Sequence, residues 1–216
     1  MKASIDQPPA ADPDSSGPLD GRDWMLRFQS GDDSAFDRIV ELYEDAVRHF
    51  LYRFLSDRNR ADDLTQEVFL RVFRSRSRYQ PTAGLKTWLF TIANRLALNE
   101  IRGLRRRRRV FAEVNEDPDE GAAPWEQSSD HREESPEDRV QRRELECLID
   151  ELIDELPTNQ RSALMLSRAG ELSYSEIGDV LGVSVMAVKS LLMRARETMR
   201  RRLRRYLDPE GESRDE

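Results

Sequence analysis

Leu172 to Arg196 read LSYSEIGDVLGVSVMAVKSLLMRAR, and this stretch holds the start and stop signals of two helices. Ser173 and Glu176 have the spacing of a capping box, in which each side chain satisfies a backbone N–H at the start of a helix. Gly182 follows as a turn signal, and a new cap comes after it. Helix, short glycine-bearing turn and helix form the helix-turn-helix pattern. The predicted helices cover residues 173–181 and 185–206.

The two faces of the second of these helices differ in chemistry. Val188, Leu192 and Ala195 share one side, where we expect them to pack on Ile177 and Leu181 of the first helix. The other side offers polar and thioether side chains near the helix N-terminus, the part that a recognition helix inserts into the major groove. Arginines follow and suit phosphates. The candidate DNA-binding residues are Met186, Lys189, Ser190, Met193, Arg194 and Arg196.

Two further helices are expected before this motif. Ser135 and Pro136 supply a cap and a proline at the first helical position. Pro157 should end the helix that they start, and another should run over residues 159–169. The apolar stripe of the first consists of Leu145, Leu148, Ile149, Leu152, Ile153 and Leu156.

The first half of the chain also shows only helical periodicity. Apolar residues recur at steps of three and four and never at steps of two, which predicts an all-helical bundle. A short helix is expected around residues 24–28, and Asp32 to Ser34 are cap candidates for the first long helix. Pro81 separates the third helix from the fourth. The apolar stripes of the three long helices span residues 36–54, 61–73 and 85–101.

Charge divides the chain into folded and unfolded segments. The net charge is −7 over 216 residues, but residues 22–109 and 139–207 carry +7 and +3. The remaining segments are acidic and hold eight of the ten prolines, a composition that buries too little apolar surface to fold. We therefore predict an all-α protein of two small helical domains joined by a flexible acidic linker, and two basic domains favour a nucleic-acid binder. We predict an N-terminal tail at residues 1–21 and an N-terminal domain at 22–109. The linker covers 110–134, the C-terminal domain 135–207 and a C-terminal tail 208–216.

Composition excludes several classes of protein. Cys147 is the single cysteine, and only His49 and His131 accompany it, so neither a disulfide scaffold nor a zinc site of known spacing is predicted. No apolar run approaches the ~20 residues of a membrane span, and the N-terminus lacks the pattern of a signal peptide. We expect a cytoplasmic protein without membrane insertion.

Several of these segments resemble one known family. The stretch from Leu156 to Arg196 resembles the C-terminal DNA-binding region of the extracytoplasmic-function (ECF) bacterial sigma factors. The segments ADDLTQEVFLRVF (61–73) and TWLFTIANRLALNEIR (87–102) look like the two signature helices of their N-terminal, promoter-melting domain. The resemblance implies a subunit that directs core RNA polymerase to promoters. Its N-terminal domain would recognise the near upstream element and its helix-turn-helix the far one. The implied partners are core RNA polymerase, promoter DNA and an anti-sigma factor, with no cofactor.

The resemblance also assigns roles to the third predicted helix. Its polar faces match the family's docking surface for the polymerase clamp, and acidic side chains in a basic domain favour a protein partner over DNA. Neighbouring aspartates on a helix point about 100° apart, which does not favour a metal site. The candidate polymerase-binding residues are Asp62, Asp63, Gln66, Glu67 and Arg71.

The fourth predicted helix and the loop before it, Tyr79 to Gly84, match the part of the family that binds the non-template strand and captures a base. Its polar side is expected to face DNA, and the basic run at its end suits phosphates. Trp88 could stack on a base, but its place in the apolar stripe favours core packing. The chain has Asn94-Arg95 where many relatives have Arg-Asn, and Leu191 where Arg is common. The candidates are Lys86, Asn94, Arg95, Asn99, Arg102, Arg105 and Arg106.

Two other classes of protein remain as alternatives. A helix-turn-helix regulator that never binds polymerase would explain the C-terminal half but not the acidic face of the third helix. An enzyme, such as a metal-dependent nuclease, would need a phosphate loop, a nucleophile motif or a metal-spaced ligand set, and the sequence offers none. The sequence therefore predicts that the protein is not an enzyme. Co-purification with core polymerase would discriminate among the three classes.

Overall fold

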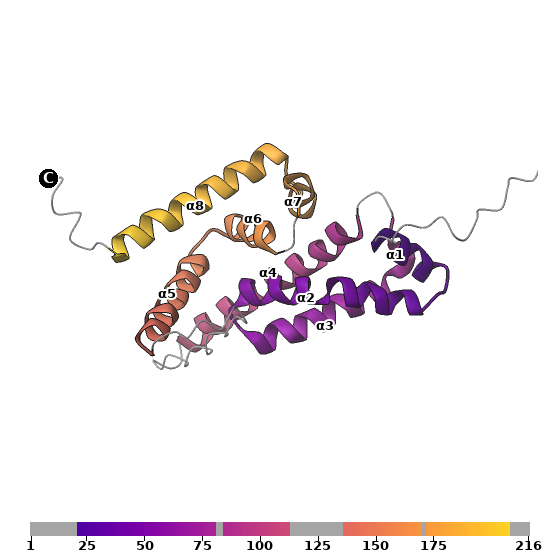
Figure 1. Cartoon of the computed structure of the whole chain (residues 1–216), viewed down its shortest axis with the longest axis horizontal. Helices are drawn as coiled ribbons and strands as arrows, with labels where there is room; N and C mark the ends of the chain where they lie inside the picture. The colour runs from indigo at the N-terminus through magenta and orange to yellow at the C-terminus, as the bar shows by residue number, and fades with distance from the viewer. Residues whose placement is uncertain (1–20, 81–83, 113–135, 170–171, 208–216) are drawn as a thin grey trace, which may run out of the picture.

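The computed structural model describes residues 21–80, 84–112, 136–169 and 172–207, and within them the chain is helical without a strand. The helices form two groups, which Figure 1 shows side by side. The first group consists of α1 (Gly21–Gln29), α2 (Ser34–Leu55), α3 (Arg58–Arg74), the 3-10 helix η1 (Arg76–Arg78) and α4 (Leu85–Ala112). The second consists of α5 (Pro136–Asp154), α6 (Thr158–Arg168), α7 (Tyr174–Leu181) and α8 (Val185–Leu207). The predicted all-α fold with a C-terminal helix-turn-helix is confirmed.

Short polar side chains begin the long helices of the first group. The Asp32 carboxylate accepts hydrogen bonds from the backbone N–H and the hydroxyl of Ser34, at 3.1 and 2.6 Å. The bond from the Ser34 hydroxyl is the main reason why the pKa of Asp32 lies below its ordinary value. At the start of α3, the Asp57 side chain accepts from the backbone N–H of Arg60 at 3.0 Å. These contacts satisfy donors that a helix start leaves without a partner.

Large aromatic side chains fill the core of the first group. Phe28, Phe50, Phe54 and Phe90 are fully buried, and the ring of Phe50 lies 5.5 Å from that of Phe54 and 5.6 Å from that of Phe90. Phe54 belongs to the last turn of α2. The aromatic core thus extends to the end of α2. This helix packs against α6 of the second group.

The second group has its core around α6, α7 and α8. Pro136 is the first residue of α5, as predicted, and Pro157 stands at the N-cap of α6. The prediction that Leu145 belongs to the apolar stripe of a core helix is wrong, because its exposed fraction is 42%. Among the side chains of α5 that the structure describes, Leu148, Leu152 and Ile153 are buried.

The two groups share one continuous core. α6 contacts α2 and α4, and α7 contacts α4, so α6 lies between α8 and the N-terminal helices in Figure 1. The buried side chains of both groups form a single cluster. The predicted division into domains at residues 22–109 and 135–207 remains a prediction.

The other predicted segments fall almost entirely outside the described residues. These are the tails and the linker, of which residues 1–20, 113–134 and 208–216 are not described. In the part of the chain that is described, no helix has the length and apolar character needed to cross a bilayer.

Candidate nucleic-acid interface

The capping box predicted at the start of α7 is present. The Ser173 hydroxyl accepts from the backbone N–H of Glu176 at 3.3 Å, and the backbone N–H of Ser173 donates to the Glu176 carboxylate at 2.7 Å. The hydrogen bond from the Ser173 hydroxyl lowers the pKa of Glu176, and the charge of Lys86 adds to this effect. The box fixes the direction in which α7 enters the motif.

Two glycines shape the turn between α7 and α8. Gly182 has φ +67°, in the left-handed region that glycine occupies without strain. Gly178 faces the turn so closely that an added Cβ would lie 2.7 Å from the carbonyl oxygen of Val183. At the start of α8, the Ser184 hydroxyl accepts from the backbone N–H of Ala187 at 3.2 Å. The turn is therefore compact, and its conformation depends on Gly178, Gly182 and Ser184.

The inner face of α8 packs as the sequence predicts. Ile177, Val188 and Ala195 are fully buried, and Leu192 is 2% exposed. α7 and α8 thus form one rigid unit, and the orientation of α8 sets which side chains point outward.

The outer face of α8 exposes the predicted reading residues. Met186 and Met193 are 71% and 66% exposed, values unusual for an apolar side chain without a partner. Lys189 is exposed and Ser190 is half-buried. The structure also exposes Arg194 and Arg196 one to two turns further along the helix.

An open hollow of about 230 Å³ lies on this face, and it contains a residue that the sequence analysis missed. Tyr174, 40% exposed, lines the hollow from the first turn of α7. The sequence does carry a signal for this residue: Tyr174 is an aromatic residue directly after the cap residue Ser173, and it lies outside the apolar stripe of the helix. The hollow is lined by Tyr174, Lys189, Leu192, Met193, Arg196, Glu197 and Arg200.

The polar residues of α4 do not all lie on one exposed side. Arg95, Asn99 and Arg102 are exposed, and Arg102 Nη1 lies 3.5 Å from Asn99 Oδ1. Asn94 was expected to share that side, but this expectation is wrong: it is only 4% exposed. The reason is that α4 is covered on two flanks, by the N-terminal bundle and by α7.

The remaining candidates on and before α4 have different surroundings. Lys86 is half-buried and close enough to Glu176 to affect its pKa. Arg106 is exposed, and the side chain of Arg105 lies outside the described part of the structure.

The loop before α4 has its first residue in the core. Tyr79, expected in a DNA-binding loop, is only 4% exposed, and its ring lies 5.2 Å from that of Trp88. This contact places the buried Tyr79 ring against the partly buried Trp88 and favours core packing for Trp88. Residues 81–83 of the loop lie outside the described residues.

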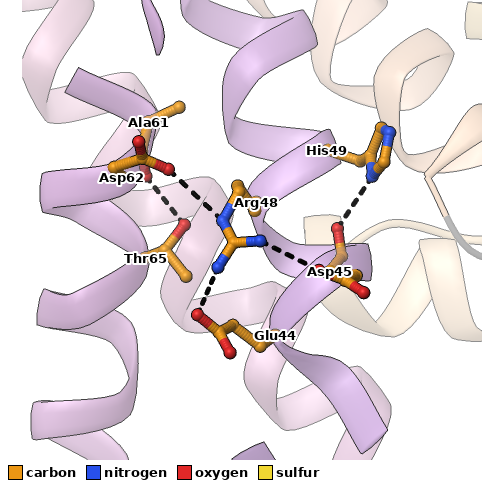
Figure 2. Close-up of polar contacts among 7 residues, drawn as sticks. All are labelled: Glu44, Asp45, Arg48, His49, Ala61, Asp62 and Thr65. Carbon is orange, nitrogen blue, oxygen red and sulfur yellow. Dashed lines mark hydrogen bonds and ion pairs between the residues drawn. The ribbon is translucent and has the colours of Figure 1, made fainter. Parts of the chain in front are cut away.

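The polar face of α3 is exposed at Asp63, Gln66 and Arg71 and half-buried at Asp62 and Glu67, and part of its charge is already paired. Arg48 of α2 lies among three carboxylates, with Asp45 at 2.9 Å, Asp62 at 3.3 Å and Glu44 on its remaining nitrogen, as Figure 2 shows. Asp62 therefore joins α2 to α3.

The other four positions of this face extend along α3. Glu67 pairs with Arg71 of the same helix at 2.7 Å. Asp63 and Gln66 are exposed to solvent. Among the described residues, no group of His, Cys, Asp or Glu has the arrangement of a metal site.

Comparison with known proteins defines the class. The family model "Sigma-70 region 2" matches residues 39–107, and the model "Sigma-70, region 4" matches residues 148–199. These are the segments that contain α3 and α4 and the helix-turn-helix, so the chain has the two regions of a sigma-type initiation factor.

Relatives narrow this class. The ECF RNA polymerase sigma factor SigW of Bacillus subtilis is 33% identical over 180 residues, which cover 83% of this chain and 95% of that protein. The RNA polymerase sigma-H factor of Pseudomonas aeruginosa is 33% identical over 182 residues, covering 84% and 92%. The chain belongs to the ECF family of RNA polymerase sigma factors. Sigma factors bind core polymerase and promoter DNA as non-enzymatic initiation factors, so a regulator that never meets polymerase is no longer a fitting alternative.

Solved structures share the fold. CnrH, in complex with the cytosolic domain of CnrY, superposes with a TM-score of 0.60 at 19% identity and covers 88% of this chain and 99% of that one. The sigma factor RpoE of Bartonella quintana, in complex with the anti-sigma factor NepR, gives a TM-score of 0.57 at 23% identity and covers 78% and 96%.

Proposed function

We propose that this sigma factor reads the far upstream promoter element with α8 and the near upstream element with α4. The observation that carries the first half is the outer face of α8. Ser173 caps the start of α7 and Ser184 caps the start of α8. The helix-turn-helix formed by these helices exposes Met186, Lys189 and Met193 on its outer side. A lysine can donate to guanine, whereas a methionine can contact a thymine methyl group or a sugar edge. Arg194 and Arg196 are assigned to phosphates.

The proposal for α4 rests on its exposed basic side. Arg95, Asn99 and Arg102 combine amide and guanidinium groups, which suit single-stranded bases and phosphates. Arg106 extends this exposed side toward the end of the helix, and Arg105 is proposed from the sequence alone, as part of the same basic run. Lys86 and Asn94 belong to the same proposed set, although Asn94 is buried and Lys86 is half-buried beside Glu176 in this arrangement.

We assign polymerase docking to the exposed face of α3. Asp63 and Gln66 face solvent, while Asp62 and Glu67 are held in ion pairs that fix their positions. Carboxylates ordered in this way have less side-chain entropy left. They therefore lose less entropy when they bind a basic surface.

An anti-sigma factor is the further partner that we propose. Two structures of similar fold contain such complexes: CnrH with the cytosolic domain of CnrY, and RpoE with NepR. We place the protein in the cytoplasm, where core polymerase and promoter DNA are found, and expect no catalytic activity of its own.

Footprinting with and without core polymerase tests the proposal. Because acidic segments flank both basic domains and the net charge is −7, the free chain should protect a promoter only weakly and the reconstituted holoenzyme strongly. A promoter selected with the holoenzyme serves as the probe, and core polymerase alone is the control. Equal protection by the free chain would contradict the proposed function.

A further inference from the structure

One carboxylate stands among the cations of α4. The sequence of this 28-residue helix contains eight Lys and Arg residues and a single acid, Glu100. The Glu100 side chain is 19% exposed, and its Oε1 pairs with Arg60 Nη1 at 3.1 Å and with Arg107 Nη2 at 3.0 Å. One oxygen atom therefore holds two guanidinium groups, one from α3 and one from α4 itself.

The start of α3 fixes the first of these partners. Arg60 lies in the first turn of α3, and its backbone N–H donates to the Asp57 side chain at 3.0 Å. The Arg60 side chain is 43% exposed, so a phosphate could reach it if the carboxylate did not hold it. The pair between Arg60 and Glu100 joins the start of α3 to the C-terminal half of α4.

The second partner lies away from the side of α4 that is proposed to bind DNA. A helix turns by about 100° per residue, so Glu100 and Arg107, which are seven residues apart, share one side. The exposed residues Asn99, Arg102 and Arg106 share another side, which the same geometry places about 120° from the first. Arg107 is held by the carboxylate, whereas its neighbour Arg106 has no ion pair among the described residues.

These ion pairs limit where DNA phosphates can bind. Cations bind the phosphates of any sequence, and such contacts orient a protein on DNA without reading bases. The Glu100 carboxylate offsets the charge of Arg60 and Arg107, and it repels a phosphate that approaches them. Because the carboxylate is half-buried, salt screens these pairs less than fully exposed ones. Phosphates are therefore attracted more strongly to the side of α4 that carries Arg102 and Arg106.

We propose that Glu100 is a positioning residue that sets DNA specificity by withholding Arg60 and Arg107 from phosphates. DNA of unrelated sequence can bind any cationic side of α4, whereas the promoter is bound through the side that carries the proposed base-reading residues. Holding two arginines on the other side thus disfavours unrelated DNA and leaves promoter binding intact. The inference rests on the proposed role of α4 in promoter binding.

Two neighbouring substitutions test whether Arg107 is withheld. Holoenzyme is reconstituted from core polymerase and full-length chain that carries Arg106→Gln or Arg107→Gln, and its binding to a labelled promoter duplex is measured by fluorescence anisotropy from low to moderate salt. Arg106→Gln should flatten the slope of log affinity against log salt by about one unit, and Arg107→Gln should leave the slope at the parent value.

The possible failures of this comparison are distinguishable. Flattening by Arg107→Gln, alone or together with Arg106→Gln, would overturn the withholding of Arg107 and still support phosphate binding by α4. An unchanged slope in both variants would contradict the proposed role of α4, and this inference with it.

Removal of the carboxylate should release both arginines. Glu100→Gln keeps the shape of the side chain without its charge. On a duplex whose near upstream element is scrambled, the Glu100→Gln holoenzyme should bind several-fold more tightly than the parent, with a slope steeper by about one to two units. Affinity for the promoter should change little, so the ratio of the two affinities should fall several-fold.

The matched control is Glu41→Gln in α2. It makes the same change in net charge and releases Arg38 from an exposed ion pair of 2.7 Å, but it leaves α4 untouched. Both affinities should stay at the parent values. An increase on scrambled DNA equal to that of Glu100→Gln would overturn the proposal, because net charge alone would then account for the effect.

The triple variant Glu100→Gln, Arg60→Gln and Arg107→Gln separates this role from a purely structural one. It lacks both released cations, so its slope on scrambled DNA should return to the parent value. If Glu100 only joined α3 to α4, Glu100→Gln would lower the melting temperature and leave the slope unchanged, and the proposal would be overturned. A steeper slope that persists in the triple variant would also overturn it. If circular dichroism shows that Glu100→Gln does not fold, the comparison of Arg106→Gln with Arg107→Gln decides the proposal, because Glu100 is intact in both.

Discussion

Side chains of different chemistry share the hollow on the outer face of α8, so each substitution there should have its own signature. Lys189, Met193 and Arg196 line this hollow together. A phosphate contact contributes to the affinity for every DNA sequence, whereas a base contact changes which sequence is preferred. Binding measured against salt and against sequence therefore separates the two roles.

Arg194→Ala should weaken holoenzyme binding to all promoter sequences alike. An exposed arginine that meets a phosphate contributes to counterion release, so the slope of log affinity against log salt should flatten by about one unit. Titrations from low to moderate salt on two unrelated promoters measure this slope. An unchanged slope combined with altered base preference would reassign Arg194 to base reading.

Met193→Ala should change base preference and leave the salt slope intact. The thioether offers no strong hydrogen bond, so we expect contact with a thymine methyl group or a sugar edge and a loss of about 1–3 kcal/mol at one position. Lys189→Ala should alter preference at a different position by a similar amount. Selection from a randomised far upstream element provides the measurement. Retention of the wild-type preferences by Met193→Ala would remove this residue from the reading set.

At the scale of the element, the capping box makes the start of α7 sensitive to acid. The fold lowers the pKa of Glu176, so its ionised form stabilises the folded state at every pH above the ordinary pKa of a glutamate. That contribution disappears as the pH falls through the lower, folded pKa. Glu176→Gln keeps an acceptor but loses the charge, and it should cost about 1 kcal/mol or less at pH 7. Melting curves at neutral and acidic pH should show the gap from wild type narrowing on acidification. If the difference in melting temperature between wild type and Glu176→Gln grew in acid, the fold would raise the pKa of Glu176 instead of lowering it.

The face of α3 can be tested without disturbing the contact between α2 and α3. Asp62 pairs with Arg48, so its reversal would alter the bundle as well as the surface. Asp63→Lys with Gln66→Lys changes exposed positions and should weaken core polymerase binding by about tenfold or more, because like charges at an interface are costly. Asp179→Lys, an exposed reversal in α7, is the control. Assembly that withstands the double change would move the docking surface to another element.

For the whole molecule, Phe54 connects the aromatic core to Arg161 of α6 in the second helix group. Its ring lies 5.5 Å from Phe50 and beneath the guanidinium of Arg161. Phe54→Ala should lower the free energy of unfolding by about 3–5 kcal/mol, measured by urea denaturation. Phe73→Ala, at a ring that is 43% exposed, should cost less. Equal losses at the two positions would contradict this ranking.

Much of this architecture is encoded locally and could be predicted. Helical periodicity, the capping box and the glycine of the turn located the helices, and the outward stripe of α8 followed from its register. Asn94 was placed wrongly because α4 is packed against elements that are distant in sequence. A helical period shows which residues share a face but not which faces meet. Arg161 was not singled out for the same reason, since its partner is a backbone carbonyl in the other domain.

The hydrogen bond from Arg161 of α6 to the carbonyl oxygen of Phe54, in the last turn of α2, also imposes an order on biosynthesis. A chain emerges from the ribosome N-terminus first, and 107 residues separate Phe54 from its donor. The nascent N-terminal domain can therefore complete α2, α3 and α4 while the last carbonyls of α2 still face water. At that stage neither α6 nor α7 exists to pack against α4. A chain still attached to the ribosome thus has its α4 face uncovered, and the finished molecule acquires the cover last.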